Sequence, residues 1–178
     1  MFTLVVGGAA SGKSEYAEQL ILRAGTLPRY YVATMEPFDA EGRARIARHH
    51  ALRAQKRFET IECPVGLSRV HLPARGAALL ECLGNLAANE LYSPAGAGGE
   101  QAALSAVVDG VESLRRQCAA LVVVTNEVFS GGCAYAGDTE SYLRLLAAAN
   151  RVLAARADAV CEVVCGLPRY YKGRGAAL

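Results

Sequence analysis

The sequence predicts an α/β protein built on a mainly parallel sheet, and two observations support this prediction. Short β-branched apolar runs alternate with stretches of helical period, which is the pattern of repeated strand–helix–strand units. A glycine-rich segment also joins the first apolar run directly to a helical stretch. Because 178 residues with 52% hydrophobic content can bury one sizeable core, we expect a single domain over 1–178.

The expected strands are short runs of aliphatic and aromatic residues. In order, they are FTLVV at 2–6, YYVA at 30–33, FETI at 58–61, AALL at 77–80, LVVVT at 121–125 and VCEVV at 160–164. The expected helices show apolar residues at helical spacing. They cover 12–23, 39–54, 84–91, 100–118 and 139–157. Between them, YSPAGAGG at 92–99 is expected to be a loop because of its Pro, Ser and Gly content.

The overall charge and the N-terminal sequence exclude several functional classes. Nineteen basic and seventeen acidic residues give a formal charge of +2, which is too balanced to attract a nucleic-acid backbone or an anionic membrane. The start of the sequence has no secretory signal pattern, and no uncharged apolar run is long enough to span a bilayer. We therefore expect a cytoplasmic protein without a nucleic-acid partner, with its six scattered cysteines reduced and mostly buried.

The strongest motif is a phosphate-binding loop, or P-loop, of the form G-x-x-x-x-G-K-[ST]. It comprises Gly7, Gly8, Ala9, Ala10, Ser11, Gly12, Lys13 and Ser14. Glycines allow successive backbone N–H groups to converge on phosphate oxygens, and the following helix directs its positive end to the same point. We expect Lys13 to bridge the β- and γ-phosphates and the Ser14 hydroxyl to ligate Mg²⁺.

Two carboxylates follow apolar runs at the ends of expected strands. Glu81 follows AALL, and Glu127 follows LVVVTN. Both are expected at the carboxyl edge of the sheet, where open α/β sheets bind ligands. We favour Glu81 as the acid that helps Ser14 to hold Mg²⁺, because its apolar run is uninterrupted; the alternative is an exposed charge at a strand end.

A basic segment at 41–57, EGRARIARHHALRAQKR, contains two of the three histidines. On a helix, a spacing of four residues puts Arg45, His49 and Arg53 in one row, whereas His50 falls in the adjoining, more apolar row. Neighbouring guanidinium groups favour a neutral imidazole at His49, which is a nucleophile able to attack a nucleotide α-phosphorus. A solvated basic helix without a chemical role is the alternative, and spacing alone does not separate the two.

Taken together, these segments resemble the adenosylcobinamide kinase/adenosylcobinamide-phosphate guanylyltransferase family, from the first strand almost to the C-terminus. The family's GGxxSGKS loop is similar to GGAASGKS at 7–14, and its R-I-x-x-H-x-x-x-R helix is matched by Arg45, Ile46, His49 and Arg53. Further similar segments are YYVATME, LLECLGNL, VVVTNEV and the long C-terminal stretch NRVLAARADAVCEVVCGLPRYYKG.

This resemblance implies roles for particular residues. His49 would carry GMP during guanylyl transfer, with His50 as the alternative, and Lys13 would act with it in catalysis. The guanine nucleotide site would be lined by residues after the second and third strands, on the basic helix and at the end of the fourth strand. These are Thr34, Met35, Glu36, His50, Ala51, Leu52, Arg53, Glu62 and Glu81.

The resemblance also implies the chemistry and the assembly. The family phosphorylates adenosylcobinamide with ATP or GTP and then transfers GMP from GTP to adenosylcobinamide phosphate, giving adenosylcobinamide-GDP for cobalamin biosynthesis. A RecA-like sheet, Mg²⁺ and a homotrimer are implied as well. This chain departs from the family after Glu127, where FSGGC replaces G-x-G-I-V-P. The resemblance implies that this departure affects the residues that contact the corrinoid and leaves the nucleotide site unchanged. A P-loop kinase without guanylyl transfer and a nucleotide-switched binding module are the alternative functions.

Overall fold

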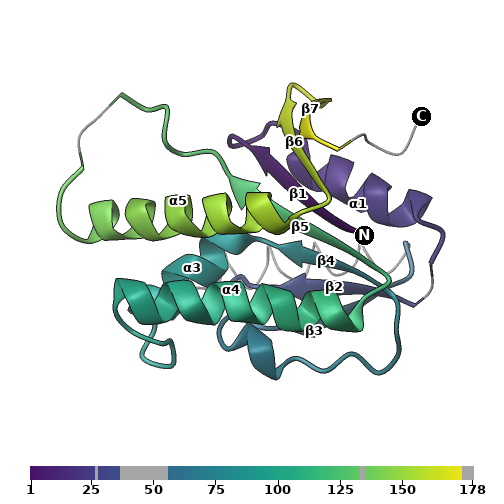
Figure 1. Ribbon diagram of the computed structural model, residues 1–178, viewed down its shortest axis with the longest axis horizontal. Coiled ribbons are helices and arrows are strands. Elements are labelled where there is room, and N and C mark those ends of the chain that lie inside the picture. Colours follow the sequence, from purple (N-terminus) through teal and green to yellow (C-terminus); the bar gives the residue numbers. More distant parts are fainter. Residues whose placement is uncertain (27, 37–55, 133–134, 174–178) are drawn as a thin grey trace.

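Seven strands in the described part of the chain form one sheet, in the order β3-β2-β4-β5-β1-β6-β7. The computed structural model describes residues 1–26, 28–36, 56–132 and 135–173 (Figure 1). All neighbouring strands pair in parallel except β6 and β7, which are antiparallel. The predicted α/β class with a mainly parallel sheet is therefore confirmed.

The strands and helices have the following bounds. The strands are β1 (Phe2–Gly7), β2 (Arg29–Ala33), β3 (Phe58–Glu62), β4 (Ala77–Glu81), β5 (Ala120–Asn126), β6 (Ala159–Val164) and β7 (Leu167–Lys172). The helices are α1 (Lys13–Arg23), the 3₁₀ helix η1 (Leu67–Arg69), α3 (Leu83–Tyr92), α4 (Glu100–Gln117) and α5 (Asp138–Arg156).

Helices cover both faces of the sheet, and strand alternation supplies a separate core to each face. On one face, Leu4 and Leu80 pack with the buried sides of α3, α4 and α5. On the other, Val5 and Leu79 pack with α1, which buries Leu20 among others. Figure 1 shows α4 and α5 lying side by side on their face. Helix α1 is therefore held on the opposite face from α3, α4 and α5.

The parallel strands bring the ends of β1 to β6 to one carboxyl edge. Strand β1 leads into the P-loop, and Glu81 ends β4; β5 lies between these two strands. In the register of the sheet, Ala33 lies opposite both Glu62 and Glu81. The topology thus gathers the P-loop and the strand-end acids at the edge where ligands bind in open α/β sheets.

The six expected strands and four of the expected helices are present, with each bound shifted by at most one residue. The expected helix at 39–54 lies outside the described residues. Two elements, η1 and β7, were not expected. Residues 167–172, for which no element was expected, return along β6 as the antiparallel strand β7. A turn at Cys165 and Gly166, with φ of 51° and 78°, joins the two strands and has the left-handed geometry of a tight hairpin.

Candidate nucleotide-binding site

The P-loop lies between β1 and α1 and contains two left-handed residues. Ala10 has φ of 55° and Gly12, at the N-terminus of α1, has φ of 88°. Alternation of left- and right-handed residues turns successive N–H groups into one concavity, which binds anions. The Ser11 Oγ is buried and has no hydrogen-bond partner among the described residues. Such an unpaired polar atom in an anion-binding loop is consistent with a phosphate ligand.

Lys13 reaches back across this loop. Its Nζ donates a hydrogen bond of 2.9 Å to the carbonyl oxygen of Gly8, so the ammonium group lies over the concavity that the backbone encloses. Space is available for a ligand at this point, because a Cβ added to Gly8 would meet no atom within 4 Å. The loop therefore combines a positive side chain with the positive end of α1.

Ser14 and Glu81 lie in direct contact, although they are far apart in sequence. The Ser14 Oγ donates a hydrogen bond to Oε1 of Glu81, and the hydroxyl of Tyr31 donates to Oε2 of the same carboxylate at 2.7 Å. Tyr31 is buried on β2 and meets Phe58 edge-on. The carboxylate is thus oriented through both oxygens, with one of them facing the first turn of α1.

Glu127, the other acid considered from the sequence, has a different environment. Its Oε1 accepts hydrogen bonds from the Phe129 amide at 2.9 Å and the Ser130 hydroxyl at 3.1 Å. Its own amide donates to the carbonyl of Gly7 at 2.9 Å. Glu127 therefore shapes the loop after β5 and ties that loop to the P-loop, whereas Glu81 is the acid that contacts Ser14.

Thr34 is buried, and its hydroxyl fixes the residue that follows Glu81. It donates to the Cys82 carbonyl at 2.8 Å and accepts from the Cys82 amide at 2.7 Å. The buried amide of Asn89 bonds the carbonyls of Thr34 and Pro64 at 2.8 and 3.0 Å. These contacts hold the ends of β2, β3 and β4 together. Burial raises the pKa of the Cys82 thiol, so this group stays protonated beside the site.

The β6–β7 hairpin supports the P-loop, a relationship that the sequence analysis did not identify. The Gly166 amide donates to the Ser11 carbonyl at 2.8 Å. A Cβ added to Gly12 would lie 3.0 Å from Gly166 Cα, so the two backbones are in close contact. Below them, the hydroxyls of Tyr16 and Tyr170 lie 2.6 Å apart. Strand β7 was not expected from the sequence, and nothing local indicated that this segment supports the nucleotide loop.

The remaining predicted site residues fall into two groups. Met35 and Glu36 follow β2 and are half-buried, and Glu62 is exposed at the end of β3, so all three lie at the carboxyl edge. The second group lies outside the described residues. It comprises His49, His50, Ala51, Leu52 and Arg53.

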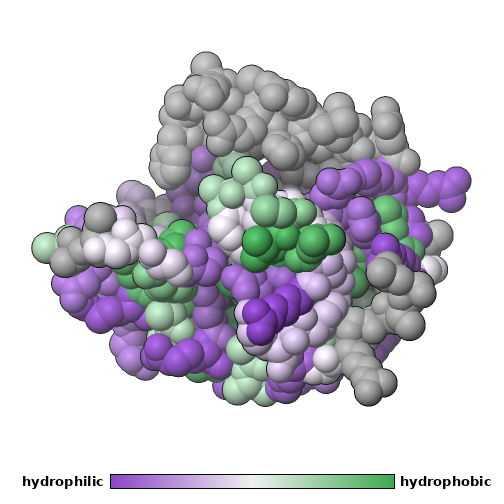
Figure 2. Space-filling view, turned by 90° about the horizontal axis from the view of Figure 1, so that it is seen from above, coloured by the Kyte–Doolittle hydropathy of each residue, from purple (hydrophilic) through white to green (hydrophobic). Residues whose placement is uncertain are grey.

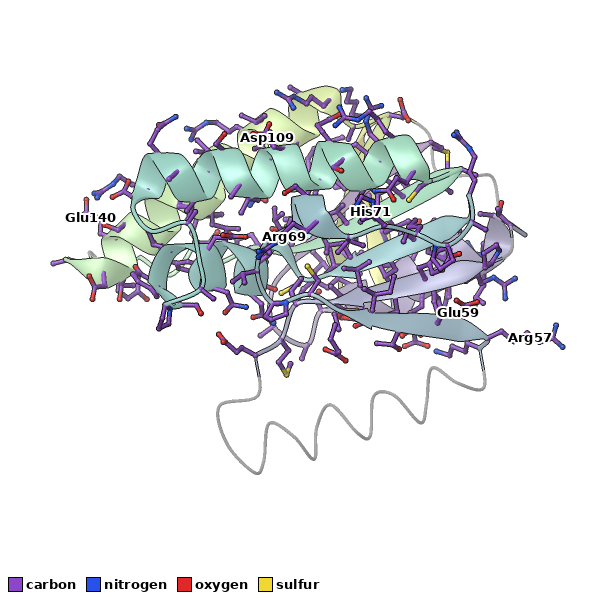
Figure 3. The ribbon with its side chains drawn as sticks, turned by 90° about the horizontal axis from the view of Figure 1, so that it is seen from below. Arg57, Glu59, Arg69, His71, Asp109 and Glu140 are labelled. Carbon is purple, nitrogen blue, oxygen red and sulfur yellow. The ribbon has the colours of Figure 1, made fainter. Side chains whose placement is uncertain are left out.

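His71 is the one histidine within the described residues, and it lies away from this edge. It is exposed and follows η1, which packs against α4 on the face opposite α1 (Figure 3). The next residue, Leu72, bonds the side chain of Gln117 at the end of α4. His71 therefore lies in a connection that packs against α4, apart from the P-loop.

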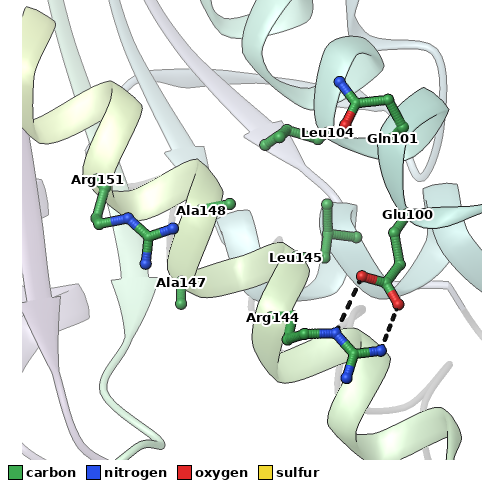
Figure 4. Close-up of a pocket in the computed structure, with 8 residues that line it drawn as sticks. All are labelled: Glu100, Gln101, Leu104, Arg144, Leu145, Ala147, Ala148 and Arg151. Atoms are coloured by element: carbon green, nitrogen blue, oxygen red, sulfur yellow. Dashed lines mark hydrogen bonds and ion pairs between the residues drawn. The ribbon is translucent and has the colours of Figure 1, made fainter.

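A pocket of about 340 Å³ lies between α4 and α5 (Figure 4). Its wall includes Arg144, which forms two hydrogen bonds with Glu100 at 2.7 and 3.2 Å, and Arg151. Because α4 and α5 cover the face opposite α1, this pocket is separate from the P-loop.

In the described residues, no cluster of three His, Cys, Asp or Glu side chains is placed to hold a metal, and no helix has the length and apolarity of a membrane span.

The fold and the site define a P-loop nucleotide-binding protein: a strand, a GGAASGKS loop, a helix and an acid on a neighbouring strand in contact with the loop serine. Comparison with known proteins gives the family. Residues 3–170 match the family model described as cobinamide kinase/cobinamide phosphate guanyltransferase, and the chain belongs to this family.

Named relatives cover nearly the whole chain. The bifunctional adenosylcobalamin biosynthesis protein CobU of Salmonella typhimurium is 34% identical, over 94% of this chain and 97% of that protein. CobP of Pseudomonas aeruginosa, with the same description, is 32% identical over 97% and 98%. Among solved structures, the flagellar accessory protein FlaH of Methanocaldococcus jannaschii has a TM-score of 0.47 at 11% identity, covering 97% of this chain and 78% of that one. The family assignment therefore rests on the sequence relatives.

Proposed function

We propose that this chain phosphorylates adenosylcobinamide and then transfers GMP from GTP to the phosphorylated product, giving adenosylcobinamide-GDP. Membership of the cobinamide kinase/cobinamide phosphate guanyltransferase family supports both activities. The observation that carries the proposal is the contact between Ser14 and Glu81 at the mouth of a loop crossed by Lys13. By the family resemblance, the enzyme works in the cytoplasm as a homotrimer.

The P-loop residues supply the binding of the triphosphate, from ATP or GTP. The loop amides and the N-terminus of α1 neutralise phosphate oxygens, and Lys13 contacts the β- and γ-phosphates. Mg²⁺ fits this donor set, because it is commonly held by one or two protein oxygens together with phosphate oxygens and water. Ser14 and Glu81 would hold it, with Tyr31 fixing the carboxylate. Bound there, the ion would offset negative charge on the phosphates.

In the kinase step, the hydroxyl oxygen of the aminopropanol arm attacks the γ-phosphorus. The bond between this phosphorus and the β–γ bridging oxygen breaks, the nucleoside diphosphate leaves, and the hydroxyl proton passes to solvent. Lys13 stabilises the charge that develops on the bridging and γ-oxygens. Catalysis of this kind depends on positioning, which the contacts of the P-loop with Glu127 and Gly166 provide.

In the guanylyl step, an imidazole nitrogen of His49 attacks the α-phosphorus of GTP and pyrophosphate leaves. A phosphate oxygen of adenosylcobinamide phosphate then displaces the imidazole, and the diphosphate linkage forms. The assignment to His49 comes from the family pattern at Arg45, Ile46, His49 and Arg53. His71 follows η1, which packs against α4 on the face opposite α1, and it serves as the control histidine.

The test is incubation with α-labelled GTP and Mg²⁺, followed by a search for a protein adduct that is labile to acid and stable to alkali. We expect the adduct in the wild type, in His50→Ala and in His71→Ala, and none in His49→Ala. Normal labelling of His49→Ala together with loss in His50→Ala would transfer the role to His50. If γ-labelled nucleotide gives labelled product but α-labelled GTP gives no adduct, the protein is a kinase without guanylyltransferase activity. If nucleotide binds but no product forms, the protein is a nucleotide-switched binding module.

A further inference from the structure

Large apolar side chains are exposed on both sides of the P-loop. Among the described residues, eight large hydrophobic side chains are exposed, and five of them lie in the loop after β5 or at the β6–β7 turn. These five are Val128, Phe129, Tyr135, Val164 and Leu167. Contiguous exposed apolar groups on a soluble protein commonly mark a binding surface. Their concentration at one edge of the sheet therefore requires an explanation.

Both segments are attached to the P-loop backbone. The Glu127 amide bonds the Gly7 carbonyl at 2.9 Å, and the Gly166 amide bonds the Ser11 carbonyl at 2.8 Å. Since β1 lies between β5 and β6 in the sheet, the two segments flank the loop from opposite sides. The β6–β7 turn lies at the top of Figure 1, and Figure 2 shows hydrophobic residues gathered near the centre of the face seen from that side. Apolar groups thus border the site of phosphoryl transfer.

Strand alternation also places Val164 and Leu167 toward the same layer of the molecule. Val163 packs in the core shared with α1, so Val164 points to the opposite face. Leu167 is the direct partner of Val164 in the hairpin and shares that face. The loop after β5 leads to α5, which lies on this face. Val164 is 55% exposed, Leu167 73% and Phe129 44%.

We propose that these side chains, with Phe129 on one side of the P-loop and Val164 and Leu167 on the other, bind the corrin ring of the acceptor. This inference rests on the proposed function, which requires an acceptor much larger than its reacting arm. The corrin ring carries peripheral methyl groups beside its uncharged amide arms, and uncharged, partly apolar segments such as VFSGG at 128–132 and VCGL at 164–167 match such a ligand. The arm then extends from the ring to the γ-phosphate at Lys13.

A second copy of this chain is a less suitable occupant. A subunit packed across both segments would cover the mouth of the P-loop, through which the acceptor hydroxyl must reach the phosphate. An acceptor ring in the same place brings its own arm to that mouth. The surface therefore serves substrate recognition while nucleotide binding remains with the loop itself.

The test compares Phe129→Ser and Leu167→Ser with Tyr171→Ser. Tyr171 is 60% exposed and lies on the same hairpin, but beside Tyr170 and Lys172, which pair with Cys161 and Val160 far from the turn. Each of the first two variants should raise the KM for adenosylcobinamide about tenfold through lost apolar contact. Tyr171→Ser should not. The dissociation constant for the nucleotide, measured by calorimetric titration, and the yield of acid-labile adduct from α-labelled GTP both need no corrinoid, and both should remain at wild-type values in all three variants.

Independent readouts keep this inference separate from the proposed function. Equilibrium dialysis with the coloured corrinoid, in the presence of nucleotide, measures acceptor binding without turnover, and Val164→Thr is an isosteric third variant. Unchanged corrinoid affinity in Phe129→Ser and Leu167→Ser would refute the surface even in an active enzyme. If Phe129→Ser or Leu167→Ser changes the sedimentation coefficient, the surface is a contact between subunits and the proposal is wrong. A wild type that binds the corrinoid but does not phosphorylate it would refute the kinase function alone, whereas absence of binding would refute both.

Discussion

Gly166 and Ser11 are joined by a hydrogen bond of 2.8 Å from amide to carbonyl, which ties the β6–β7 turn to the middle of the P-loop. The same turn brings Gly166 against Gly12, and the Tyr16–Tyr170 contact joins α1 to β7 below it. The C-terminal hairpin is therefore part of the structure that holds the loop in shape. Substitutions at these contacts should affect nucleotide binding as well as stability.

Gly12→Ala tests the close approach to Gly166. An alanine at φ of 88° is strained by about 1–2 kcal/mol, and its Cβ would also lie 3.0 Å from Gly166 Cα. We expect nucleotide affinity to fall by at least about tenfold in calorimetric titration. Gly25→Ala is the control, because Gly25 has φ of 65° and its Cβ would meet nothing within 4 Å. Equal loss of affinity in both variants would show that strain alone is responsible.

Tyr31→Phe tests the orientation of Glu81. The change removes the hydroxyl that bonds Oε2 at 2.7 Å. The concentration of Mg²⁺ that half-saturates kinase activity should rise roughly tenfold, as for other residues that orient a metal-binding carboxylate. The measurement is initial rate against Mg²⁺ concentration at saturating nucleotide.

Tyr30→Phe is the matched control for that experiment. The neighbouring Tyr30 is equally buried, but its hydroxyl accepts a hydrogen bond from the Ala74 amide at 3.2 Å, away from the carboxylate. Both substitutions should lower the free energy of unfolding by about 1 kcal/mol. If Tyr30→Phe shifts the Mg²⁺ dependence as strongly, the effect comes from loosening of β2 and the role assigned to Tyr31 is wrong.

The hydroxyls of Tyr16 and Tyr170 should be energetically coupled. Burial and the hydrogen bond to Tyr16 raise the pKa of Tyr170, as expected for a hydroxyl that stays protonated in this contact. Urea unfolding of the wild type, Tyr16→Phe, Tyr170→Phe and the double variant should give a coupling energy of about 1 kcal/mol. Additive losses would mean that the contact contributes nothing to stability.

The buried thiols should make the protein less stable at alkaline pH. Burial raises the pKa of Cys161 from 9.0 to about 11 and that of Cys118 from 9.0 to about 12. Above pH 9 the unfolded chain loses these protons and the folded chain keeps them, so stability is full below pH 9 and falls as pH rises toward 11 and 12. Each thiol contributes a slope of up to about 1.4 kcal/mol per pH unit.

The measurement is the free energy of unfolding in urea at a series of pH values from 8 upward. Cys118→Ala should reduce the alkaline slope, although its stability at pH 8 will also be lower because a buried group is removed. An unchanged slope in this variant would show that Cys118 ionises equally in the folded and unfolded chains.

Local pattern was sufficient to predict most of the sheet and the P-loop. A strand followed by GGAASGKS and a helix is encoded within a short stretch, and the apolar run before Glu81 placed that acid at a strand end. The contact of Glu81 with Ser14 follows once β4 and β1 are near neighbours in one sheet. Site features of this kind are predictable because parallel topology brings strand ends to one edge.

The unpredicted features depend on contacts between distant segments. Strand β7 was missed because its turn, Cys165–Gly166, is not among the usual hairpin dipeptides and its side chains are mostly exposed. Thr34 was expected at the nucleotide site by resemblance, and the structure shows its hydroxyl committed to Cys82. Thr34 bonds Cys82 and Asn89, which lie 48 and 55 positions further along the chain, so no local spacing could reveal these contacts.

Cys165 sits at the tip of the turn that touches the P-loop and is exposed, whereas the other described cysteines are buried free thiols. A maleimide dye on this sulfur, in a Cys133→Ser background, would place a fluorophore one residue from the Gly166–Ser11 hydrogen bond. Its emission would report nucleotide arrival in real time by stopped flow, without a tryptophan, which this chain lacks. A fluorophore at this position of the hairpin would therefore allow the order of the two reactions to be followed.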